Sequence, residues 1–375
     1  MRMMTLVRVF LVSLIAISAF AGPAPAQPVE VTISPDSLLN GLNESDRAQV
    51  RDALQFWLRA LRAAEDPDRV VTIRGQLLRL ALKYPNETYQ SFFAQEGAKV
   101  LGAIFRDRPE TLRQHKEVNL AMVFAELPTV AARHAYREMV FHPNGGVRYL
   151  GWRGYRRIRT DILAEGGESA EQFYKLLEKA AAEEDSPIVA EELFAVLTPP
   201  AFTATPLPPE ALARMRARLL NILGQAWSHW CRVVLRGSAV PMQSLQAGMG
   251  AFRRTAAVMG DDADARKAVV QSLANMVWCA SKTYLDAQAA GEAAETNEEL
   301  LLELETALRA ISGLDLSPLA ARLGTNAPEN KDPRMVRVAA LEWIESLRKP
   351  FGIEDPKDRF APADGPPATQ PGPTT

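Results

Sequence analysis

Proline is distributed unevenly along the 375 residues, and this distribution limits where helices can run. Of the 26 prolines, three lie at 23–28, five at 199–209 and seven at 350–373. Proline lacks a backbone N–H and breaks a helix interior. Elsewhere apolar residues recur at helical spacing, as in 45–64, and the alternation typical of strands hardly recurs. The sequence therefore predicts an all-α fold.

The proline-rich stretches set the predicted domain boundaries. We expect an N-terminal helical block over 36–197, a proline-rich linker over 198–210 and a C-terminal helical block over 211–349. Residues 350–375 hold too little apolar material to offset the entropy of ordering, so we expect a disordered tail there. Residues 27–35 include the alternating PVEVTIS and predict an extended N-terminal arm.

The first 26 residues have the features of a secretory signal peptide. Arg2 and Arg8 supply positive charge, 9–21 is an apolar run of 13 residues, and 24–26 is a small-x-small cleavage site. A run of this length is too short to cross a bilayer as a helix. We therefore expect export by a Sec-type signal, a periplasmic or extracellular location and no membrane span after cleavage. An uncleaved N-terminal anchor is the alternative.

A repeated pattern opens four of the helical segments, which start at Asp66, His142, Asp185 and Asp332. Each begins with a proline-bearing turn, continues with a valine and then carries small or apolar residues at i, i+3, i+4 and i+7. The starts at His142 and Asp185 are 43 residues apart.

Two of these segments match in detail. Val147-Arg148 corresponds to Val336-Arg337, and Gly151 corresponds to Ala340, where a small residue lets a neighbouring helix approach closely. The pattern resembles HEAT-like repeats, in which a turn, a Val-Arg pair and an alanine-rich face recur about every 40 residues. The resemblance implies an α-solenoid of helical hairpins. An irregular helical bundle is the alternative.

Charge is balanced overall but not locally. Lys and Arg number 43 and Asp and Glu 45, for a net charge of −2, which does not indicate a nucleic-acid partner. Residues 133–159, however, hold seven arginines and one acid, and 161–192 hold ten acids and two lysines.

A helical wheel of 147–160 gives one candidate binding face. It places small and apolar residues on one narrow side. The broad opposite side carries Arg148, Trp152, Tyr155, Arg156 and Arg159. Arginine beside aromatic rings can bind a protein or an anionic polymer of the cell envelope. The competing interpretation is that these arginines pair with the acids of 161–192 inside the fold.

Cys231 and Cys279 are the two cysteines, each beside a tryptophan in a helical pattern. An oxidising compartment permits a disulfide between them, and the alternative is two buried free thiols. No metal-ligand spacing and no familiar catalytic motif is present, so no metal, cofactor or catalytic residue is predicted.

Two function hypotheses follow. The first is an exported, non-catalytic helical-repeat protein that serves as an interaction scaffold for a protein or an envelope polymer. The alternative is an all-α toroid that hydrolyses or cleaves glycans with paired carboxylates, which the sequence does not single out. The oligomeric state is not predicted.

Overall fold

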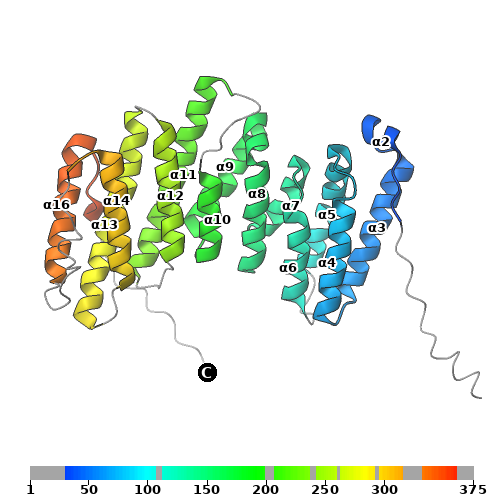
Figure 1. The fold of residues 1–375 in the computed structure, drawn as a ribbon, viewed down its shortest axis with the longest axis horizontal. Coiled ribbons are helices and arrows are strands. Elements are labelled where there is room, and N and C mark those ends of the chain that lie inside the picture. Colours follow the sequence, from blue (N-terminus) through cyan, green and yellow to red (C-terminus); the bar gives the residue numbers. More distant parts are fainter. Residues whose placement is uncertain are drawn as a thin grey trace, which may run out of the picture.

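In a computed structural model the chain is a row of helices (Figure 1). The structure describes residues 30–106, 112–198, 207–236, 242–259, 262–291, 295–315 and 332–360. Within these ranges every regular element is a helix, so the predicted all-α class is confirmed. The predicted signal peptide, 1–26, lies outside the described residues.

The long helices form two layers, and within a layer each helix except α7, which does not pack closely against α9, packs against the next but one along the chain. The first layer contains α3 (Glu44–Arg62), α5 (Glu87–Arg106), α7 (Arg133–Met139), α9 (Gly167–Glu183), α11 (Pro209–Leu235), α13 (Ala263–Ala290) and α16 (Pro333–Phe351). The second contains α4 (Pro67–Ala81), α6 (Arg113–Ala125), α8 (Gly145–Glu165), α10 (Pro187–Leu197), α12 (Met242–Met259) and α14 (Glu295–Ser312). The short helices are α2 (Pro35–Asn40), η1 (Val130–Ala132) and α17 (Pro356–Phe360).

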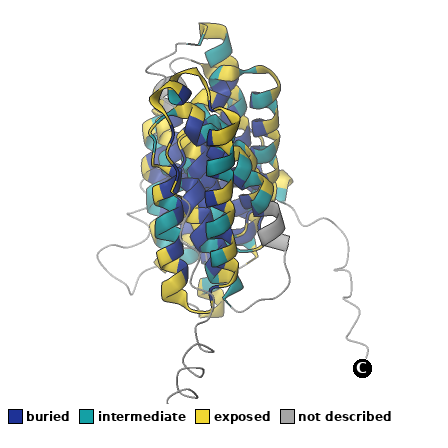
Figure 2. Cartoon of the chain, turned by 90° about the vertical axis from the view of Figure 1, so that its right-hand side faces the viewer, coloured by how far each residue is buried: buried dark blue, intermediate teal, exposed yellow. Residues whose placement is uncertain are grey.

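The core lies between the two layers. Seen along the row in Figure 2, the buried residues gather in the middle and the exposed ones on the outer faces. One cluster of buried apolar side chains runs from the N-terminal arm to Ile353, next to the last helix. A continuous core of this kind arises when each hairpin buries its apolar side against its neighbours.

Local sequence explains where the helices begin. The side chains of Asp66, Asn144 and Asp332 accept hydrogen bonds from backbone N–H groups in the first turns of α4, α8 and α16. Such caps satisfy donors that the helix itself leaves unpaired. Pro67 and Pro333 follow at the first helical position, where a missing N–H costs nothing.

The two predicted helical blocks are packed together. Across the predicted linker, α9 packs against α11 and α10 against α12, so both layers continue from one block into the next. Residues 199–206 of that linker lie outside the described ranges. At the N-terminus, Val31 and Ile33 of the predicted arm are buried, and the Tyr84 hydroxyl accepts a hydrogen bond from the Ile33 N–H.

The prediction of a disordered tail from residue 350 is wrong for 350–360. Helix α16 continues to Phe351, Ile353 is buried, and α17 packs against α13. The Phe360 ring stacks on Trp278 with their centroids 6.0 Å apart. These few apolar contacts outweigh the proline content of the segment. The rest of the predicted tail, 361–375, lies outside the described residues.

Candidate binding site

The structure places the aromatic members of the predicted face in the core. Trp152 is 0% exposed and Tyr155 is 2% exposed. The Tyr155 hydroxyl donates to the Arg133 carbonyl at 3.0 Å, and its ring lies 5.1 Å from that of Phe173. The expectation that Trp152 and Tyr155 stand on an exposed face is therefore corrected. Helix α8 packs against α6, α7, α9 and α10, so its broad side is covered as well as its narrow one.

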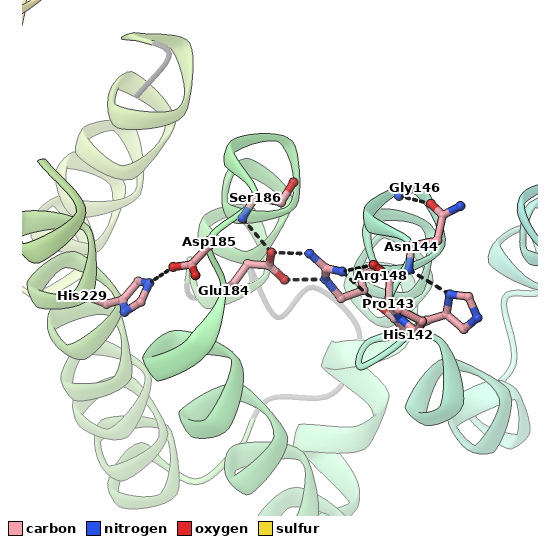
Figure 3. A network of polar contacts seen from close by, with 9 residues as sticks. All are labelled: His142, Pro143, Asn144, Gly146, Arg148, Glu184, Asp185, Ser186 and His229. Atoms are coloured by element: carbon pink, nitrogen blue, oxygen red, sulfur yellow. Dashed lines mark hydrogen bonds and ion pairs between the residues drawn. The ribbon is translucent and has the colours of Figure 1, made fainter. Parts of the chain in front are cut away.

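Arg148 binds within the fold. Its Nε and Nη2 donate to the Glu184 carboxylate at 2.9 and 2.8 Å, and its Nη1 donates to the carbonyls of His142 and Pro143 (Figure 3). The hydrogen bonds to Glu184 raise the pKa of Arg148. Glu184 is 6% exposed and also accepts from the Ser186 N–H at 2.8 Å. One guanidinium thus joins the turn before α8 to the turn before α10.

The same network reaches one helix further. Next to Glu184, Asp185 contacts the His229 Nε2 of α11 at 2.9 Å (Figure 3). On the other side, the His142 Nδ1 accepts from the Asn144 N–H at 3.1 Å, and burial lowers the pKa of His142. The network therefore ties three successive parts of the row together along one edge, which is a structural role.

Arg156 and Arg159 are also paired inside the fold, with α10. Arg156 Nε lies 3.0 Å from the Glu192 carboxylate, and burial raises the pKa of Glu192. Arg159 donates to the carbonyls of Ala195 and Val196 near the end of α10. Burial lowers the pKa of Arg159 to about 10. All three arginines of the predicted face therefore stabilise the packing of adjacent helices.

Replacing Arg159 by alanine is expected to lower the free energy of unfolding by about 2 kcal/mol, because two helix-end carbonyls lose a charged donor. Urea denaturation followed by circular dichroism measures this. An unchanged urea midpoint would contradict the assigned role.

A hollow lies elsewhere on the same part of the row, between α7 and α9. Helix α7 has only seven residues, and it does not pack closely against α9, unlike the other neighbours in its layer. The gap holds a cavity of about 640 Å³ over α8. Its lining residues are Arg133, His134, Arg137, Glu138, Phe141, Tyr155, Ile162, Ser169, Gln172, Phe173, Lys175, Leu176 and Lys179.

Two cations of this hollow have acidic partners outside it. Arg133 pairs with Glu165 at 3.0 Å. Lys179 lies 4.0 Å from Glu183 and 4.4 Å from the centre of the Phe141 ring. Both pairs are solvent-exposed and hence weak and open to exchange.

The other two cations are unpaired. Arg137 and Lys175 are exposed, and neither forms an ion pair or hydrogen bond within the part of the chain that the structure describes. Arg137 is thereby the exception among the seven arginines of 133–159, since the other six bind Glu126, Glu165, Glu184, Glu192 or carbonyls of α10. The hollow thus combines positive charge with an apolar floor of Ile162 and Phe173.

Sequence reasoning missed this site, although a signal was present. Arg133 and Arg137 are four residues apart, as are Lys175 and Lys179, and this spacing puts each pair on one helix face. Ser169 and Gln172 lie in α9 on the wall of the hollow.

Comparison with known proteins gives no family: no protein-family model, curated protein or solved structure matches this chain. Within the described ranges, no helix is long and apolar enough to cross a membrane. Over the same residues, no three His, Cys, Asp or Glu side chains converge in a way that would hold a metal ion.

Proposed function

We propose that this protein is an exported, non-catalytic scaffold of HEAT-like helical repeats that binds an acidic segment of a partner protein in the hollow between α7 and α9. The observation that carries the proposal is the hollow itself, which is lined by the unpaired Arg137 and Lys175 together with apolar side chains. A cavity of about 640 Å³ is within the usual range for a ligand site.

The two layers of helical hairpins support the HEAT-like assignment. Val147 and Val336 are both fully buried, and the arginine after each crosses to a neighbouring element. Arg148 binds the turn before α10, and Arg337 donates to the Trp278 carbonyl at 2.6 Å. The match is partial, because α8 belongs to the second layer whereas α16 packs in the first.

The charge around the hollow favours an acidic partner. The described residues that line the hollow include four cations and one carboxylate, Glu138. Phe141, which is 37% exposed, and the half-buried Leu176 offer apolar surface that an acidic protein segment can match with an apolar side chain of its own. A purely polyanionic envelope polymer would use the cations and leave this surface uncovered, so we favour a protein.

Export remains part of the proposal and rests on 1–26, whose charge and apolar run fit a Sec-type signal. The alternative function, a glycan hydrolase or lyase, needs two convergent carboxylates. Glu138 is the one carboxylate among the described residues that line the hollow, so the hollow does not supply such a pair.

The test is a charge reversal in the hollow. We expect Arg137→Glu with Lys175→Glu to weaken binding of a labelled peptide of alternating glutamate and phenylalanine by about tenfold or more, because two attractions become repulsions. Fluorescence anisotropy measures the affinity. Unchanged thermal unfolding shows that the fold is intact, as expected for two exposed residues without partners.

The matched control is Arg232→Glu with Arg266→Glu, which reverses two exposed cations of α11 and α13 and changes the net charge equally. Equal affinities of the two double variants would refute the hollow as the site. The parent protein could instead bind polygalacturonate more tightly than the peptide, and only the Arg137→Glu, Lys175→Glu variant could lose this binding. That result would indicate that the partner is an anionic polymer and not a protein.

A further inference from the structure

The two cysteines meet in the C-terminal half of the row. Cys231 lies on α11 and Cys279 on α13, the longest described helices, which pack closely along their length. Both side chains are 0% exposed, and after burial itself the neighbouring Cys279 thiol is one of the causes that raise the pKa of the Cys231 thiol. The structure has both as free thiols. Two cysteines on closely packed helices can be bridged with little backbone movement when their Cα atoms lie within about 7 Å of each other.

Other elements cover the residue beside Cys279. Trp278, the neighbour of Cys279, is covered by the Phe360 ring of α17 and by the Arg337 guanidinium of α16, which lies 4.9 Å from the indole centre. Because both cysteine side chains are 0% exposed, an oxidant has no direct path to the folded thiols, and the order of folding and oxidation matters.

We propose that Cys231 and Cys279 form an intramolecular disulfide that joins α11 to α13 in the exported protein. The oxidant is a disulfide-bonded thiol compound, such as glutathione disulfide or a dithiol oxidase. One cysteine thiolate attacks a sulfur of the oxidant and releases one reduced thiol. The other cysteine thiolate then attacks the mixed disulfide and releases the second thiol. Two electrons pass to the oxidant, and the two thiol protons pass to the two thiols released.

The bond forms during folding, before α11 and α13 pack. In the folded protein, burial raises the pKa of the Cys231 thiol, which suppresses the nucleophilic thiolate. A protein that has folded in the reduced state is therefore expected to resist oxidation, whereas an unfolded chain reacts freely. This inference goes beyond the proposed binding function and does not depend on the hollow.

The test is refolding of the reduced, urea-unfolded protein with and without a glutathione redox buffer. With the buffer, we expect a mass loss of about 2 Da, the two hydrogens of the thiols. We also expect that iodoacetamide does not alkylate the two cysteines and that a disulfide links the peptides containing Cys231 and Cys279. The oxidised protein should also unfold at a urea concentration about 1 M higher than the reduced one, because the closed loop restricts the unfolded chain.

The control is the Cys231→Ala variant, which keeps one buried thiol and should show neither the mass loss nor the redox-dependent midpoint. Two thiols that react with iodoacetamide after unfolding of protein refolded in the redox buffer would overturn the proposal, provided that its urea unfolding is cooperative. Loss of peptide binding in the hollow variants would not bear on this result.

Discussion

Replacing Gly154 by alanine is expected to lower the free energy of unfolding by about 2 kcal/mol or more, despite the higher helix propensity of alanine. An added Cβ would lie 2.5 Å from a ring carbon of Tyr136, closer than real contacts permit. Tyr136 cannot retreat easily. It is fully buried, and its hydroxyl donates to the carbonyls of Phe124 and Leu127 at 3.0 and 2.6 Å.

The matched control is Gly75→Ala, also in a helix interior. An added Cβ at Gly75 meets nothing within 4 Å, so this variant should be more stable than the parent by about 1 kcal/mol. Urea denaturation of both variants gives the comparison. If Gly154→Ala were as stable as Gly75→Ala, the close approach of α7 to α8 would be wrong, and with it the position of α7 beside the hollow.

The helices were predictable from the sequence because the residues that determine where a helix begins lie next to its first turn. Caps such as Asp66 and Asp332, followed by proline, lie within a few residues of the helix starts that they determine. Gly151 also allows the close approach of a neighbouring helix that the sequence predicts, since an added Cβ would lie 2.9 Å from atoms of Met139 and Val140.

The candidate site was not predictable in the same way, because exposure depends on the whole array. A helical wheel gives α8 one core side and one free side, but α8 is enclosed on several sides, so Trp152 and Tyr155 are buried. The hollow exists because α7 is short and leaves α9 partly uncovered, which depends on how two separate hairpins stack. Similarly, Ile353 and Phe360 look like part of a proline-rich tail until α13 provides a surface for them.

Replacing Arg148 by alanine is expected to lower the free energy of unfolding by about 3 kcal/mol, because it leaves the buried Glu184 without its cation. The variant also removes the donors to the His142 and Pro143 carbonyls. Glu184→Ala should cost less than Arg148→Ala, since Arg148 then keeps both carbonyl acceptors and is itself partly exposed. Urea denaturation of the two single variants and the double variant measures the coupling between the side chains.

The control for this cycle is the exposed pair of Arg133 and Glu165, in which Arg133→Ala should cost at most about 1 kcal/mol. A coupling energy for Arg148 and Glu184 no larger than that of the exposed pair would contradict a structural role for Arg148. Arg148 would then be available to a partner, and the basic face of α8 would again compete with the hollow as the binding surface. A large coupling instead leaves Arg137 and Lys175 as the cations of the hollow that are free to bind, because neither forms an ion pair or hydrogen bond in the described part of the chain.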